Sequence, residues 1–238
     1  MRGVRSWLVA AAAAAMVVAM PGAASATDGF APLDRPGPAL SVPKKQLDAA
    51  LTCNGPLTGL AKDPVLLVPG TTVTPEPNFS WNYQRAFTSM GIRWCAVTLP
   101  FDATGDIQVA AEYVVHSLRT MNRKSGREVD VVGWSQGGMV PRWALRFWPD
   151  TRKTVDDVVG LSPSNHGTVL SDVTCGDCNP AFHQQASQSQ FLEALNSGAE
   201  TFAGIDYTVA YTTTDEVVVP NLGPAASSAL RTGNGVIA

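Results

Sequence analysis

The stretch that most constrains the fold of this chain is Gly133-Trp134-Ser135-Gln136-Gly137, which lies between an apolar run and a helical pattern. It matches G-x-S-x-G, a strand-to-helix turn that presents a serine hydroxyl at the end of a sheet strand. The serine sits in a cramped backbone conformation there, so small neighbours are needed where strand and helix approach each other. We therefore predict a strand over 129–134, a helix over 136–147 and Ser135 as the candidate nucleophile.

Short apolar runs and amphipathic segments alternate along the rest of the chain. Residues 27–42 are rich in Pro, Gly and Ala and are typical of coil. The expected strands are 65–68, 92–99, 129–134, 155–161 and 207–212, and the expected helices are 81–90, 107–121 and 136–147. This alternation predicts an α/β fold, a mostly parallel sheet with helices on both faces.

The first residues are typical of a secretory signal peptide over 1–26. Arg2 and Arg5 precede the apolar run 7–20, and Ala24-Ser25-Ala26 fits the A-x-A cleavage pattern. The apolar run is short for a membrane span, although an uncleaved anchor is the alternative reading. We expect a secreted, extracellular protein without an integral membrane anchor, in which 27–238 (238 − 26, about 212 residues) forms one domain.

The four cysteines suit an oxidising compartment. Cys53, Cys95, Cys175 and Cys178 allow three pairings, of which Cys53–Cys95 with Cys175–Cys178 is the simplest. A redox C-x-x-C normally lies on a thioredoxin-like turn, which is absent here, and a zinc site would need two further ligands where only His183 is near. We therefore expect disulfides and no metal.

The charge balance bears on the partners of the chain. Without Arg2 and Arg5 it has 15 basic and 20 acidic side chains, a net charge of 15 − 20 = −5, and it contains no basic run. Nucleic acid is therefore not expected as a partner. Charged residues make up 16% of the chain, below the roughly 25% of average domains. This composition favours apolar or interfacial substrates.

A serine nucleophile that attacks a carbonyl group needs donors for the developing oxyanion and an acid to orient its base. One donor is the N–H after the nucleophile, on Gln136, and the other is expected in the loop after an earlier strand, where Thr71 follows Pro69-Gly70. The acid is expected past the carboxyl end of a later strand. Asp215 lies there, after 207–212, and we prefer it to the adjacent Glu216.

The base is not evident in the sequence. The order of the fold requires a histidine after Asp215, and the three histidines, His116, His166 and His183, all precede it. His116 falls within the amphipathic helix 107–121. His166 follows a strand, but using it would require an inverted order of acid and base.

Together these segments resemble the Candida antarctica lipase B type of α/β-hydrolase and its relatives among secreted bacterial lipases. The matching segments are 47–53, 66–71, 134–138 and 214–218. The resemblance implies Ser135 as nucleophile, Thr71 and Gln136 as oxyanion donors and Asp215 as acid. It also implies that Cys95 is the disulfide partner of Cys53.

The resemblance further implies a substrate pocket that includes Trp134, Thr168 and Gln185. His183 falls where the family has an aromatic residue, so it is not the base. In the family the histidine follows one more strand, and 233–236 looks like the approach to that strand. We therefore expect a C-terminally truncated chain in which the last strand and the histidine loop are missing.

These observations predict a secreted serine hydrolase of carboxylic esters, most simply a triacylglycerol lipase working through an acyl-enzyme, with no metal or organic cofactor. Its partner would be a lipid or other ester, met at a lipid–water interface. Two alternatives stay open: a non-catalytic binding protein that lacks its base, and an esterase of polyesters or cutin.

Overall fold

The computed structural model describes residues 29–174 and 179–238, and it is built on a seven-stranded sheet. The strand order is β1-β3-β2-β4-β5-β6-β7, and every neighbouring pair is parallel except β1 with β3. The strands are β1 (Leu51–Cys53), β2 (Val65–Val68), β3 (Trp94–Val97), β4 (Val129–Trp134), β5 (Val155–Leu161), β6 (Asp206–Ala210) and β7 (Val236–Ile237). The predicted α/β fold with a mostly parallel sheet is confirmed.

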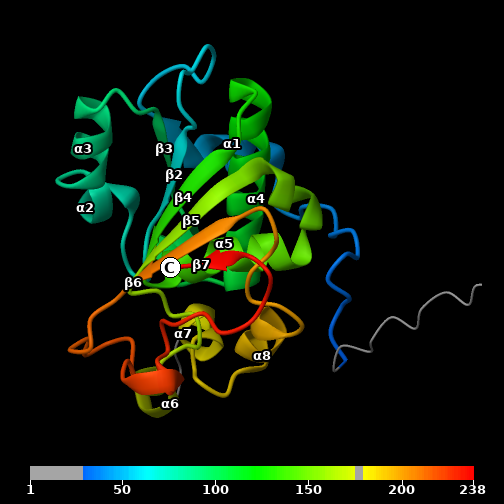
Figure 1. Cartoon of the computed structure of the whole chain (residues 1–238), viewed down its shortest axis with the longest axis vertical. Helices are drawn as coiled ribbons and strands as arrows, with labels where there is room; N and C mark the ends of the chain where they lie inside the picture. Colours follow the sequence, from blue (N-terminus) through cyan, green and yellow to red (C-terminus); the bar gives the residue numbers. More distant parts are fainter. Residues whose placement is uncertain (1–28, 175–178) are drawn as a thin grey trace, which may run out of the picture.

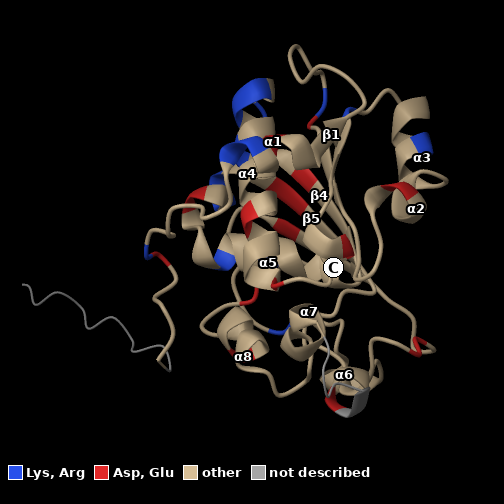
Figure 2. Ribbon diagram, turned by 180° about the vertical axis from the view of Figure 1, so that it is seen from behind, with Lys and Arg blue, Asp and Glu red and all other residues tan. Residues whose placement is uncertain are grey.

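Helices cover both faces of the sheet. In Figure 1, α2 and α3 lie on one side and α6, α7 and α8 gather beyond one end of the strands, while Figure 2 shows α4 and α5 in front of the opposite face. The α-helices are α1 (Lys44–Ala50), α2 (Pro75–Phe79), α3 (Tyr83–Ser89), α4 (Ile107–Ser125), α5 (Gln136–Phe147), α6 (Val169–Thr174), α7 (Pro180–Gln184) and α8 (Gln190–Asn196). Short 3₁₀ turns occupy Pro100–Ala103, Pro149–Thr154 and Gly223–Ala225.

The two layers explain why the central strands are apolar along their whole length. All four residues of β2 are buried, since both of its faces are covered. The larger core lies between the sheet and α4 with α5, and a smaller one lies under α2 and α3. Helix α4 begins where the Asp106 side chain accepts the Gln108 N–H and ends at Gly126 in a left-handed conformation.

The predicted helix 81–90 is confirmed as α3, which is shorter at both ends. It begins at Tyr83 because the Asn82 side chain caps it by accepting the Tyr83 N–H. A separate helix that was not predicted, α2, precedes it and begins at Pro75. Strands β3 and β6 are also shorter than the predicted 92–99 and 207–212. The last strand, which we expected to be missing, is present in part, because Val236–Ile237 pair with β6 in parallel as β7.

A disulfide joins Cys53 and Cys95, residues that stand opposite each other on β1 and β3. This confirms one of the predicted pairs. Residues 1–26 and the pair Cys175–Cys178 lie outside the described residues. Within the described ranges, no helix is both long enough and apolar enough to cross a membrane.

The N-terminal segment 29–42, which we call the strap, lies across α4, α5 and the turn after α5. Its end is held by Glu112 on α4, whose carboxylate accepts the N–H groups of Ser41 and Val42. Nearer its start, three side chains beneath the strap, of which Arg146 and Trp148 are buried, donate to its carbonyl oxygens. The pairs are Arg146 Nη2 with Ala31 O (2.6 Å), Arg152 Nη2 with Leu33 O (2.6 Å) and Trp148 Nε1 with Pro38 O (2.8 Å).

Candidate active site

Ser135 occupies the turn between β4 and α5 in a strained conformation. Its φ of 54° and ψ of −125° lie in a region that a side chain other than glycine rarely adopts. Its N–H donates to Leu161 O at 2.9 Å, and its carbonyl accepts the Gly138 N–H at 2.9 Å. These bonds to β5 and α5 hold the serine in this conformation.

The glycines of the motif are required by close backbone contacts. A Cβ on Gly133 would lie 2.0 Å from Gly137 O, and a Cβ on Gly137 would lie 2.1 Å from Val68 O. Neither neighbour can move away, because each is main chain inside the sheet or the first turn of α5. The turn that presents Ser135 therefore requires glycine at both positions, because there is no room for a side chain.

The two predicted oxyanion donors lie together behind the serine. Thr71, in the loop after β2, donates its hydroxyl to Gln136 Oε1 at 2.7 Å. Gln136 is the first residue of α5, so its N–H has no acceptor within the helix and stands at the positive end of the helix dipole. In the described part of the chain, neither the backbone N–H of Thr71 nor that of Gln136 has a backbone acceptor.

A cavity of about 480 Å³ opens at this edge of the sheet. The sequence-predicted residues that line it are Thr71, Trp134, Ser135, Thr168, Gln185 and Asp215. Leu170 also lines it, in the segment 167–170 that resembles the pocket of the family. Sequence reasoning missed other parts of the wall, which are Thr72, Ser162, Ser164, Ser171, Phe182, Val217 and Val218. Gln136 stands behind this wall, fully buried.

Asp215 lies in the turn after β6, where its position is fixed by the main chain. Its Oδ1 accepts the N–H groups of Val217 and Val218, both at 2.9 Å. Among the described residues that line the cavity, it is the one with a charged side chain. The structure thus brings the predicted acid and the predicted nucleophile to the same cavity.

The three histidines are engaged elsewhere or exposed. His116 Nε2 lies 2.8 Å from Asp48 Oδ1 on α1. His166 Nε2 lies 3.2 Å from Glu200 Oε2, and His183 is exposed on α7. Across the described ranges, none of them forms a hydrogen bond to the candidate nucleophile or acid.

A buried carboxylate that the sequence did not single out ties the C-terminal segment to this edge. Glu200 is 4% exposed, and it accepts the Arg231 N–H at 3.0 Å as well as the bond from His166. Burial is the largest influence and raises its pKa, but the His166 bond and the charge of Arg142 together bring the pKa below its usual value. The ionised Glu200 therefore fixes the chain on its way to β7.

A mostly parallel sheet with a strained serine at a strand-to-helix turn, facing a cavity at the carboxyl ends of the strands, defines the α/β-hydrolase class. Comparison of the sequence with protein families assigns the chain to a narrower group within this class. A model of the family described as lipase (class 2) matches residues 62–235, and the chain belongs to this family.

Individual relatives agree with this assignment. Lipase B of Pseudozyma antarctica is 35% identical over 204 residues, which cover 84% of this chain and 60% of the relative. The crystal structure of Aspergillus fumigatus lipase B is 31% identical with a TM-score of 0.77, covering 89% of this chain and 54% of the other. The resemblance to the lipase B type is confirmed, and the chain spans between about half and three fifths of the length of these relatives.

A more distant match concerns the fold alone. The mature form of a Bacillus licheniformis lipase is 18% identical with a TM-score of 0.59, and the match covers 78% of this chain and 90% of the other. The sheet and its helical layers are therefore shared beyond the lipase B relatives.

Proposed function

We propose that this chain carries the nucleophile, the oxyanion site and the acid of a secreted lipase that hydrolyses carboxylic esters through an acyl-enzyme. The observation that carries the proposal is the strained Ser135, which faces one cavity together with Thr71 and Asp215. Membership of the lipase (class 2) family supports the same activity.

In the proposed reaction, Ser135 Oγ attacks the ester carbonyl carbon while its proton passes to a base. The carbonyl oxygen becomes an oxyanion, stabilised by the N–H groups of Thr71 and Gln136 and by the Thr71 hydroxyl. When the intermediate collapses, the base returns its proton to the leaving alcohol and an acyl ester on Ser135 remains. Water, deprotonated by the same base, then releases the carboxylic acid and restores the serine.

The proposal requires a base that His116, His166 and His183 do not provide, because their contacts lie elsewhere. We assign this role to a histidine outside the given sequence, oriented by Asp215. The Oδ1 of Asp215 is held by two main-chain N–H groups, which fixes the carboxylate for this task. An acid with a fixed orientation selects the correct tautomer of its histidine.

The cavity wall supports an apolar acyl group as substrate. Leu170, Phe182 and Val217 contribute apolar side chains to the wall, and Thr71 and Gln185 contribute a hydroxyl and an amide that bond to Gln136, the residue after Ser135. A fatty acyl ester such as a triacylglycerol places its chain against the first group and its carbonyl against the second. Export is supported by the Cys53–Cys95 disulfide, which persists in an oxidising compartment.

The deciding experiment is Ser135→Ala in the longer protein that contains this chain. We expect hydrolysis of p-nitrophenyl butyrate and of emulsified tributyrin to fall by about 10⁴-fold or more, because the nucleophile is lost. Ser117→Ala is the matched control, since Ser117 is a fully buried serine on α4 whose hydroxyl bonds to Tyr113 O. Its rates should equal those of the wild type.

Each alternative predicts a different result. Retained turnover in Ser135→Ala would refute the assignment of the nucleophile. Ester binding without turnover by the wild type would instead indicate a non-catalytic binding protein. This is the second candidate, because in the described ranges none of the three histidines bonds to Ser135 or Asp215. Hydrolysis of polyester films at rates above those of tributyrin would indicate a polyester or cutin esterase.

A further inference from the structure

Behind the proposed oxyanion site lies a chain of buried neutral groups. Gln136 is fully buried, Gln185 is 5% exposed and Ser164 is 1% exposed. They come from α5, from the residue after α7 and from the loop after β5, so three separate segments meet here. Buried polar groups are most stable when their donors and acceptors are matched. The acceptors of this chain are matched, whereas Gln136 Nε2 has no hydrogen-bond partner among the described residues.

The orientation of the Gln185 amide is fixed from two sides. Ser164 Oγ donates to Gln185 Oε1 at 2.8 Å, and Gln185 Nε2 donates to Ala181 O at 3.2 Å. A reversed amide would place its oxygen against the Ala181 carbonyl, which cannot donate. Ser164 therefore helps to keep the amide nitrogen of Gln185 on the side of Thr71 and Gln136.

This nitrogen lies within hydrogen-bond distance of both Thr71 and Gln136, the two residues of the proposed oxyanion site. Gln185 Nε2 is 3.1 Å from Thr71 Oγ1 and 3.1 Å from Gln136 Oε1. In the free protein the Thr71 hydroxyl donates to Gln136 Oε1. The hydroxyl can bond to a substrate oxyanion only if it leaves that acceptor.

Leaving a fully buried oxygen without a donor would oppose this movement. The Gln185 amide removes the difficulty, because its N–H can remain on Gln136 Oε1 after the Thr71 hydroxyl has turned away. The hydroxyl can then move to the oxyanion without leaving an unsatisfied acceptor behind. The exchange involves neutral groups alone, so it does not depend on pH.

We propose that Ser164 is a positioning residue that holds the Gln185 amide so that the Thr71 hydroxyl can pass from Gln136 to the oxyanion. This inference rests on the proposed esterase function. It concerns the transition state, so it predicts an effect on kcat and little effect on KM.

The test is a double-mutant cycle on the longer protein with p-nitrophenyl butyrate. Ser164→Ala should lower kcat about tenfold and leave KM within about twofold, less than the 10²-fold or more that follows removal of a whole oxyanion donor. Thr71→Val removes the hydroxyl but keeps the N–H. In that background Ser164→Ala should have no further effect on kcat, because the hydroxyl that it positions is gone.

Further measurements separate this role from a structural one. Ser164→Thr keeps the hydroxyl and should retain most of kcat, and the pH dependence of kcat in Ser164→Ala should match that of the wild type. Equal losses in Ser164→Ala and Ser164→Thr, unchanged kcat in Ser164→Ala, or the same loss with and without Thr71 would each overturn the inference. No hydrolysis by the wild type would overturn the proposed function as well, so the two failures are distinguishable.

Discussion

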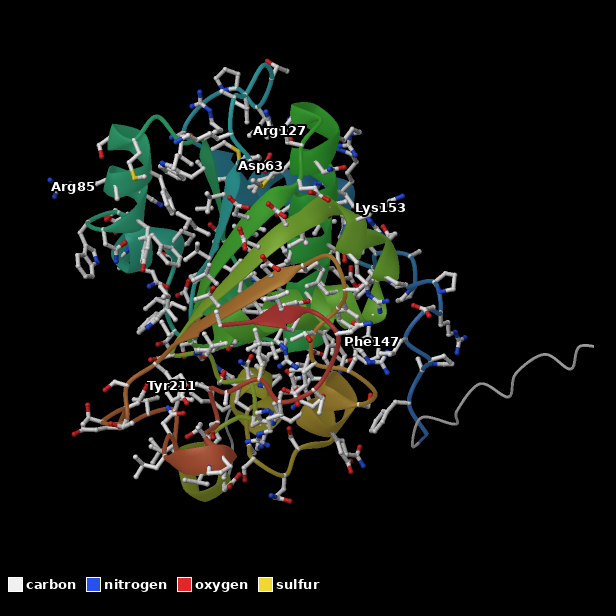
Figure 3. All side chains as sticks on the ribbon, in the orientation of Figure 1. Asp63, Arg85, Arg127, Phe147, Lys153 and Tyr211 are labelled. Carbon is white, nitrogen blue, oxygen red and sulfur yellow. A yellow bond between two sulfur atoms is a disulfide. The ribbon has the colours of Figure 1, made fainter. Side chains whose placement is uncertain are left out.

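The two ends of the parallel sheet carry different kinds of polar side chain, mostly neutral at one end and acidic at the other. At the carboxyl ends of the strands, hydroxyl and amide groups surround Ser135, and Asp215 supplies the charged side chain of the cavity wall. At the amino ends stand the carboxylates Asp63, Asp130, Asp156, Asp157 and Asp206. Figure 2 shows the acidic bands across β4 and β5, and Figure 3 shows Asp63 and Arg127 at the opposite end of the sheet from Tyr211, which follows β6.

The carboxylates are close enough to repel one another. Oxygens of Asp63, Asp130 and Asp156 lie within 4.8 Å of each other, and Asp157 stands beside Asp206 in the register of β5 and β6. Burial, followed by the charge of Asp157 and of its neighbours, raises the pKa of Asp130 to about 6.

The two ends of this sheet are therefore strained in different ways. At the catalytic edge the strain is geometric, held in the backbone of Ser135 and relieved by glycines, and it does not titrate. At the amino edge it is electrostatic, and it grows as the carboxylates ionise. The backbone strain at Ser135 therefore does not change with pH, whereas the repulsion at the amino edge does.

The largest expected effect is on the geometric side. Gly137→Ala should lower the free energy of unfolding by about 3 kcal/mol or more, because the added Cβ would meet the carbonyl oxygens of Val68 and Pro69. Gly91→Ala is the control, since a Cβ there meets no atom within 4 Å and only its positive φ of 67° opposes it. Its loss should be about 1 kcal/mol in urea titrations. Equal losses would show that crowding at Gly137 is relieved.

A smaller effect is expected on the electrostatic side. The folded-state pKa of Asp130, about 6, is above its usual 3.8, so folding favours the protonated form. This contribution is fully present below about pH 4 and is lost as the pH rises through about 6. Asp130→Asn should therefore raise the free energy of unfolding at pH 7 by about 1 kcal/mol, after allowance for solvent screening.

The check is urea titration of the variant and the wild type from about pH 4 to 7. The two curves should converge at the acidic limit, where the carboxyl group is neutral in both folded and unfolded chains. A difference that stays constant across this range would show that the repulsion is absent.

The smallest effect is expected at the cation that faces the carboxylates. Arg127 Nη1 lies 2.9 Å from Asp63 Oδ1, in a half-exposed pair, and Arg127 Nε also donates to Leu60 O at 2.8 Å. Arg127→Ala should lower the free energy of unfolding by about 0.5 kcal/mol at low salt. The loss should shrink in high salt and in the Asp130→Asn background, because both weaken the field of the carboxylates. A loss that is insensitive to both would assign the role of Arg127 to its bonds with the carbonyl oxygens of Leu60 and Ala61.

Much of the catalytic edge could be predicted because its signals are local. Five consecutive residues specify the turn at Ser135. Gln136 begins a recognisable helix, and Thr71 and Asp215 each follow a recognisable strand. Thr168 and Gln185 came from the resemblance alone, and the structure brings them to the same cavity as the serine. Their catalytic and binding roles stay predictions.

The rest depends on pairing between distant parts of the chain. Asp63 and Asp130 become neighbours through the register of β2 with β4, which no short pattern encodes. The bond between Ser164 and Gln185 joins two loops in the same way. The start of α3 differs from the predicted residue 81 because the Asn82 cap sets it, and α2, which Pro75 opens, lies before the apolar spacing that predicted a helix.

The strap carries a consequence for how sequence variation is distributed. Arg146, Trp148 and Arg152 donate to its carbonyl oxygens, and every amino acid offers a carbonyl oxygen. The position of the strap is therefore fixed in part by side chains of α5 and of the turn after it. A substitution at Ala31 or Pro38 keeps the carbonyl oxygen that accepts the bond, whereas a substitution of Arg146 or Trp148 removes the donor.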